Sequence, residues 1–203
     1  MPKIVDAEEK RTEIVYAAWS VIAERGLPAA TLRAVAAEAQ MSMGAVQHYF
    51  DSKESMLLYA CERMADLAGT QWSATAEGGT ARERLDALAL TSLTDHPLQR
   101  VGIAAWSAFV NRAAADEAMA EIVLRVWTEA TRHTAALLTE AARESGVELV
   151  GSPEDAAATF QALLDGLGIR VLAGHLPFER ARELAARFLD HQLAAGDERS
   201  HRW

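Results

Sequence analysis

The segment 31–53 carries hydrogen-bonding side chains at a spacing that suits the reading of base edges. Successive residues of a helix are about 100° apart, so a helix over 43–50 that turns Val46 inward brings Phe50 beside it. The opposite face then holds Gly44, Gln47 and His48. A major groove about 12 Å wide admits such a face, because its low relief lets the backbone approach while an amide and an imidazole exchange hydrogen bonds with bases.

The flanks of the segment carry groups that suit phosphates. Ser52 is a predicted N-cap, so Lys53 lies in the first turn of the next helix, where amides and an ammonium favour an anion. We expect Met43, Ala45, Gln47 and His48 to face bases with Gly44 on the same face, and Thr31, Arg33, Tyr49 and Lys53 to hold phosphates.

Two short helices joined by a tight turn must position these residues. Thr31 is a good N-cap for the first, Ser42 is one for the second, and the turn of about three residues has helix-turn-helix length. An earlier helix from Thr12, which Gly26 ends, would pack across both through a stripe of Ile14, Ala17, Ala18, Val21 and Ile22. Lys10, Arg11 and Thr12 at its start could reach phosphate or form a solvated helix end.

The segment resembles the DNA-binding domain of the TetR family of bacterial transcriptional repressors over about 12–58. The resemblance is carried by Gly26, Thr31, Ala36, Ser42, Gly44, Tyr49-Phe50, Asp51-Ser52-Lys53-Glu54 and their spacing. Gln40 departs from the usual turn glycine, which implies left-handed strain or a different turn. Gln47 departs from the usual tyrosine of the recognition helix.

Composition indicates an all-α protein. Half of the 203 residues are hydrophobic, Ala and Leu dominate, and Pro and Gly fall mostly between periodic runs. Residues 1–53 hold six Lys or Arg against seven Asp or Glu, net −1, so the remainder carries −8 of the total −9. The acidic remainder is therefore not expected to bind nucleic acid. The single Cys61 excludes an intramolecular disulfide.

The periodicity predicts six further helices and two domains. Residues 1–52 would form the helix-turn-helix domain and 53–203 a helical ligand-binding and dimerisation domain, whose helix from about 53 is the connector. The other predicted helices are 81–94, 98–114, 117–144, 153–172 and 178–193, with loose ends at 1–10 and from Gly196. Neither a signal peptide nor a membrane-spanning run is apparent, so we expect a cytoplasmic protein that does not bind membranes.

Tryptophan and threonine on the middle helices suggest a pocket for a largely apolar small molecule. Large rings with a few hydroxyls are what such a pocket requires, and the TetR resemblance implies a cavity among these helices. A tryptophan stripe at helical spacing is also typical of a core, and both interpretations stay open. The expected lining is Met64, Leu67, Leu88, Thr91, Trp106, Phe109, Val110, Trp127, Thr131, Phe160 and Leu164.

The last two helices are expected to form a homodimer interface, as the resemblance implies, although their stripes could instead close the monomer's core. Gly166 in mid-helix costs about 1 kcal/mol against Ala, which suggests a close helix approach. The expected residues are Leu163, Gly166, Leu167 and Arg170 on one helix and Leu184, Phe188, Leu189 and Gln192 on the other.

These observations together predict a ligand-responsive regulator that binds double-stranded DNA at a palindromic operator, most simply a repressor. No nucleophile with a base and no pair of histidines at metal-binding spacing is apparent, so we expect no catalytic site, metal or cofactor. A helical protein–protein adaptor and a helical enzyme without a recognisable motif are the alternatives.

Overall fold

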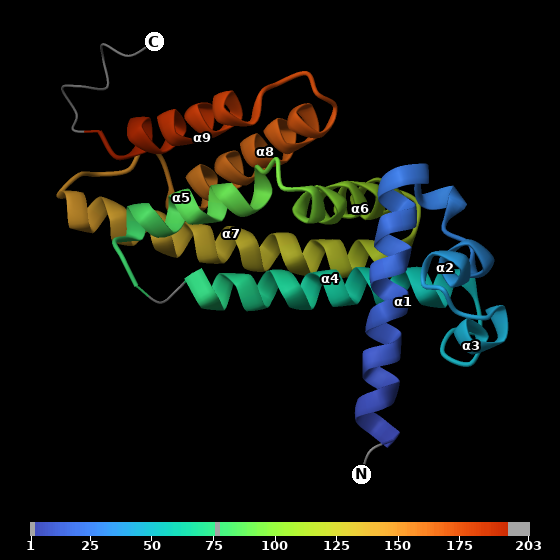
Figure 1. The fold of residues 1–203 in the computed structure, drawn as a ribbon. Coiled ribbons are helices and arrows are strands. Elements are labelled where there is room, and N and C mark those ends of the chain that lie inside the picture. The colour runs from blue at the N-terminus through green and yellow to red at the C-terminus, as the bar shows by residue number, and fades with distance from the viewer. Residues whose placement is uncertain (1–2, 76–77, 195–203) are drawn as a thin grey trace. The chain divides into compact units, whose positions relative to one another are not determined.

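A computed structural model of the chain describes residues 3–75 and 78–194, with side chains from 7–70 and 78–194. Within these residues the protein forms nine α-helices and one 3₁₀ helix, with no strand (Figure 1). The elements are α1 (Lys3–Arg25), η1 (Leu27–Ala29), α2 (Leu32–Glu38), α3 (Met43–Gln47), α4 (Lys53–Thr75), α5 (Ala81–Ser92), α6 (Pro97–Ala113), α7 (Glu117–Ser145), α8 (Pro153–Leu172) and α9 (Phe178–Gln192). The predicted all-α fold class is confirmed.

The chain divides into two compact units. The first extends to Leu67 and includes Arg100–Leu124, and the second contains Ala68–Gln99 and the described residues from Arg125 onward. Helices α4, α6 and α7 each contribute residues to both units. The expected division into a DNA-binding domain that ends at residue 52 and a ligand-binding domain that begins at residue 53 is a division by function. It stays a prediction.

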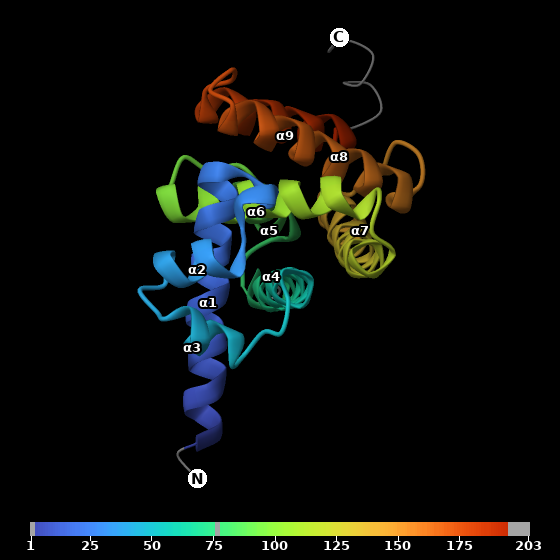
Figure 2. The same cartoon turned by 90° about the vertical axis from the view of Figure 1, so that its right-hand side faces the viewer.

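In the first unit α1 packs against η1 and α2, and α2 packs against α3. Helix α1 lies across the first part of α4, beside α2 and α3 (Figure 1, Figure 2). Gly26 ends α1 with φ 80°, a left-handed conformation that glycine adopts without steric cost. The predicted α1 stripe is buried, together with Val35, Val46, Phe50, Met56 and Cys61.

Helix α1 begins at Lys3, so the expectation of a loose segment over 1–10 is wrong from Lys3 onward. No residue between Lys3 and Thr12 breaks a helix, and two ion pairs at i, i+3 stabilise this part. Arg11 pairs with Glu8 at 2.9 Å, and Lys10 pairs with Glu13 at 2.8 Å.

Both predicted caps of the helix-turn-helix are present. Thr31 Oγ1 accepts a hydrogen bond from the Ala34 amide, and Ser42 Oγ accepts one from the Ala45 amide, each at 3.1 Å. Helix α3 ends at Gln47, earlier than the expected residue 50. The chain still turns inward there, because the Phe50 amide donates to the Val46 carbonyl at 3.0 Å.

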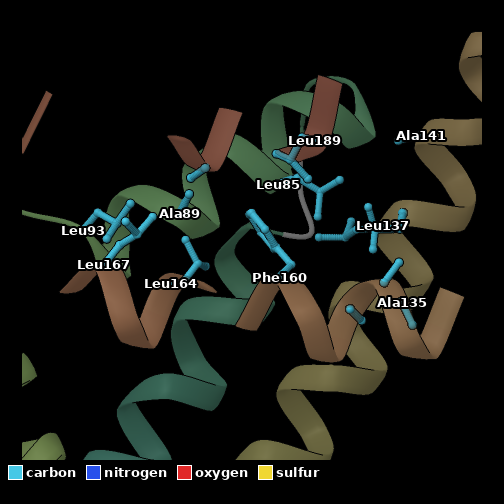
Figure 3. Packing of buried hydrophobic residues seen from close by; sticks show 14 of the residues in the cluster. Leu85, Ala89, Leu93, Ala135, Leu137, Ala141, Phe160, Leu164, Leu167 and Leu189 are labelled. Carbon is cyan, nitrogen blue, oxygen red and sulfur yellow. The ribbon is translucent and has the colours of Figure 1, made fainter. Parts of the chain in front are cut away.

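The second unit has its core between α5, α7, α8 and α9 (Figure 3). Figure 3 shows Leu85 and Ala89 of α5 turned toward Phe160 and Leu164 of α8. Thr80 caps α5 in a capping box with Glu83, and Ser152 caps α8 ahead of Pro153. The boundaries of α5 to α9 lie within two residues of those predicted, whereas the expected loose tail from Gly196 falls outside the described residues.

None of the helices in the described parts of the chain is both long and apolar enough to cross a membrane.

Candidate nucleic-acid interface and ligand groove

Helix α3 presents the polar face that its spacing predicts. Val46 is fully buried, whereas Gly44, Gln47 and His48 are exposed. No atom lies within 4 Å of the position that a Cβ would take on Gly44, so this face is open as well as flat. Met43 and Ala45 are half-buried at its edge. The arrangement leaves an amide and an imidazole available to a major groove.

Two of the four residues expected at phosphates, Thr31 and Lys53, form hydrogen bonds within the protein. The Thr31 hydroxyl caps α2, and Lys53 Nζ donates to the carbonyl oxygen of Pro28 at 2.8 Å. Lys53 therefore ties the start of α4 to η1, although an ammonium has two further donors that can bind phosphate. Arg33 is exposed on α2, and Tyr49 is half-buried after α3.

Side chains of α1, of α4 and of the two residues Tyr49 and Phe50 that follow α3 contact one another. The Glu8 carboxylate accepts hydrogen bonds from Arg11 Nη1 at 2.9 Å and from the Tyr59 hydroxyl at 3.0 Å. The Arg11 guanidinium carbon lies 6.0 Å from the centre of the Tyr49 ring, and the Tyr59 ring centre lies 5.4 Å from that of Phe50. We call Glu8, Arg11, Tyr49 and Tyr59 the Glu8 network.

The Glu8 network also changes the acidity of its members. The Tyr59 hydroxyl and then Arg11 lower the pKa of Glu8 below its ordinary value, so the carboxylate stays ionised. Burial, followed by the bond to Glu8, raises the pKa of Tyr59, which keeps its proton. Sequence reasoning missed Glu8 and Tyr59, because they are 51 residues apart and only the fold brings them together.

The second unit carries a groove along one face of α7. It has a volume of about 620 Å³ and brings together Trp127 and Thr131, two of the residues predicted at a ligand. Trp127 is 41% exposed, which is unusual for so large a ring. The rest of the lining consists of Thr128, Arg132, Ala135, Ala136, Thr139 and Glu154.

The other residues predicted at a ligand lie outside that lining. Met64, Leu67, Trp106, Phe109 and Val110 belong to the first unit, and Leu88, Thr91, Phe160 and Leu164 belong to the second. Phe160 and Leu164 are packed in the core of the second unit. Their assignment to a ligand site stays a prediction.

The residues predicted at a dimer interface divide into buried and exposed sets. Leu167 and Leu189 belong to the core of the second unit, with Leu163, Leu184 and Phe188 packed against it. Gln192 is buried and accepts a hydrogen bond from the Val150 amide at 3.3 Å. Gly166 and Arg170 are exposed on α8, on a face that also presents Ala162, Asp165 and Ile169.

In the parts of the chain that the structure describes, no three His, Cys, Asp or Glu side chains are grouped so that they could hold a metal ion.

Residues 14–60 match the family model "Bacterial regulatory proteins, tetR family", and residues 81–194 match the model "BetI-type transcriptional repressor, C-terminal". The chain belongs to the TetR family of bacterial transcriptional regulators. A BetI regulator of Burkholderia mallei is 31% identical over 202 residues, which cover 96% of this chain and 98% of that protein. The Bacillus subtilis regulator PksA is 45% identical over only 60 residues, 30% of this chain and 29% of that protein.

Solved structures of transcriptional regulators share the fold. A putative regulator of Saccharomonospora viridis in complex with choline has a TM-score of 0.80 at 26% identity, over 91% of this chain and 97% of that one. A putative TetR-family regulator of Rhodococcus sp. has a TM-score of 0.77 at 26% identity, over 92% and 100% of the two chains. The predicted family and the predicted function as a transcriptional regulator are thus confirmed.

Proposed function

We propose that this TetR-family chain is a repressor that binds a palindromic operator as a homodimer and leaves it when a small molecule binds. The observation that carries the proposal is the α3 face, on which Gly44, Gln47 and His48 are exposed while Val46 is buried. A gel shift with DNA from beside the protein's own gene tests it. The repressor should retard that fragment, whereas the adaptor and enzyme alternatives predict no shift.

The base and phosphate roles assigned above belong to this proposal. Gln47 can bond the N6 and N7 edge of adenine, which is worth about 1–3 kcal/mol of discrimination against a wrong base. One recognition helix covers too few base pairs for useful specificity, which supports a two-fold assembly on a palindrome. The proposal also implies a cytoplasmic protein without catalytic activity.

The exposed face of α8 supports the homodimer. Gly166 is exposed with no atom within 4 Å of the position that a Cβ would take, so packing within the chain gives no reason for glycine there. Ile169, one turn further along, is 48% exposed. A partner helix approaching this face would bury Ile169 and use the space at Gly166. We therefore centre the interface on Gly166, Ile169 and Arg170.

A sedimentation experiment at micromolar concentration separates dimer from monomer. The wild-type protein should run at twice the 22.0 kDa mass of the chain. Ile169→Glu should run as a monomer, because an unpaired carboxylate would be buried at the interface. Leu98→Glu is the matched control, since Leu98 is 78% exposed on α6 and should tolerate the charge. A wild-type monomer of 22.0 kDa would refute the dimer.

The α7 groove supports a small-molecule effector at Trp127 and Thr131. Its volume of about 620 Å³ lies in the range of small-molecule sites. Choline is the first compound to test, because the similar Saccharomonospora viridis regulator was crystallised with it. The methyl-covered cation of choline could lie on the Trp127 ring, and a neutral tert-butyl isostere would separate shape from charge.

A paired titration tests the effector site. An effector that quenches tryptophan fluorescence should also weaken DNA binding, and a coupling of about 1–3 kcal/mol would change affinity roughly 5- to 150-fold. Trp127→Ala should remove both responses and leave DNA affinity intact, because the ring is partly exposed. Thr131→Val keeps the fluorescent ring and should weaken effector binding alone. If Trp127→Ala abolished DNA binding itself, Trp127 would be part of the core.

A further inference from the structure

The Glu8 network lies beside the end of the α3 segment and contains an arginine. Nη1 of Arg11 is bonded to Glu8, and a guanidinium has five N–H donors, so donors remain for a second anion. The side chain of Arg11 is 37% exposed. It can therefore meet a phosphate without leaving Glu8.

The network fixes the position of Arg11 from two directions. Along α1, Arg11 is held by the Glu8 carboxylate, which is itself held by the Tyr59 hydroxyl of α4. On the side of the residues that follow α3, the Arg11 guanidinium lies over the Tyr49 ring. The other neighbour of the Tyr49 ring is the His48 ring, at a centre-to-centre distance of 5.1 Å. An arginine on an exposed helix otherwise samples many rotamers, and restricting them reduces the entropy lost on binding.

We propose that Arg11 is a further DNA-backbone contact of this protein, and that Glu8 and Tyr59 are positioning residues that hold its guanidinium beside Tyr49. The inference rests on the proposed DNA-binding function. It adds a phosphate contact from α1 to those expected around α3, and it makes the contact depend on a hydroxyl of α4.

The salt dependence of DNA affinity tests the contact. Each lost phosphate contact lowers the slope of log affinity against log salt concentration by about 0.9, which corresponds to roughly eightfold weaker binding at 0.1 M salt. Arg11→Met should show both changes in fluorescence anisotropy with the fragment that the wild-type protein retards. Arg11→Lys should restore most of the slope, because it keeps the charge. Arg180→Met removes a cation paired with Glu183 on α9 and should leave the slope unchanged.

A double-mutant comparison tests the positioning roles. Tyr59→Phe removes the bond to Glu8 but keeps the ring beside Phe50, so it should weaken DNA binding less than Arg11→Met does. The variant with both changes should match Arg11→Met alone, because the hydroxyl acts only through Arg11. Tyr16→Phe is the matched control for the loss of a tyrosine hydroxyl, since Tyr16 lies on α1, as Arg11 does, and is 53% exposed.

Distinct results would overturn each part. If the wild-type protein binds DNA and Arg11→Met has the same salt slope as the wild-type protein, the phosphate contact is excluded. Losses that multiply in the double variant would exclude positioning of Arg11 by Tyr59. If the wild-type protein bound no DNA at all, the proposed function would fail, and with it the inference that rests on it.

Discussion

Lys53 is the residue for which the structure adds most to its expected role. Its ammonium donates to the Pro28 carbonyl, so the side chain joins α4 to η1 before any DNA is present. We predict that Lys53→Ala lowers the free energy of unfolding by about 0.5–1.5 kcal/mol, the net value of one such bond. It should also weaken binding to all DNA sequences alike and reduce the salt slope by about 0.9.

Urea unfolding and anisotropy titrations measure the two effects of Lys53→Ala separately. Lys10→Ala is the control for stability, because the Lys10 ammonium forms an ion pair with Glu13 within α1. Loss of stability with an unchanged salt slope would restrict Lys53 to its structural role.

His133 should make the stability of the second unit depend on pH. Burial, and then the charge of Arg84, lower the pKa of His133 below its ordinary value of 6.5. In the unfolded chain the imidazole takes up a proton near pH 6.5, whereas in the folded chain it does so only at lower pH. Its contribution to stability is therefore complete above about pH 6.5 and is lost as the pH falls through the folded pKa.

Urea unfolding at several pH values checks this contribution. The wild-type protein should lose more stability than His133→Gln between neutral pH and about pH 5, because glutamine does not titrate. Identical pH profiles for the two proteins would show that His133 has the same pKa in the folded and unfolded chains.

At the scale of elements, the turn between α2 and α3 is where the sequence departs from the family pattern and the backbone is strained. Gln40 has φ 54°, a left-handed conformation that costs a non-glycine residue about 1–2 kcal/mol. Gln40→Gly should remove this strain at a cost of about 0.5–1 kcal/mol in chain entropy, for a net gain of about 0.5–1 kcal/mol. Thermal unfolding should show a higher midpoint for Gln40→Gly but not for Gln40→Ala, and equal midpoints would mean that the turn relaxes without strain.

Among the features of this fold, the sequence predicted the helices and their N-caps best. Caps at Thr31, Ser42 and Ser52 are local signals, because a hydroxyl bonds an amide three residues away, and all three are present. The early start of α1 was missed, although the i, i+3 ion pairs that support it, Glu8 with Arg11 and Lys10 with Glu13, are also local signals. Periodicity placed apolar residues such as Leu167 on a face, but it could not tell a core from an interface, because both bury the same kind of side chain.

At the scale of the whole molecule, family membership explains why one chain combines a flat polar helix with an acidic helical region. The net charge of −8 beyond residue 53 keeps DNA away from that region, so attraction must come from local groups such as Lys53 and Arg33. The α7 groove, which we propose as the effector site, was only partly predicted from the sequence. The α7 groove contains Trp127 and Thr131, whereas Phe160 and Leu164 are packed in the core.

Selection of binding sites from a random duplex library tests the central claim most directly, because it depends on both base reading and two-fold assembly. We expect the wild-type protein to enrich an inverted repeat whose half-sites are about one or two helical turns apart. Gln47→Ala should relax the preference at one equivalent position in each half-site, at a cost of about 1–3 kcal/mol. A library that stays random, or a single asymmetric site that Gln47→Ala leaves unchanged, would contradict the account.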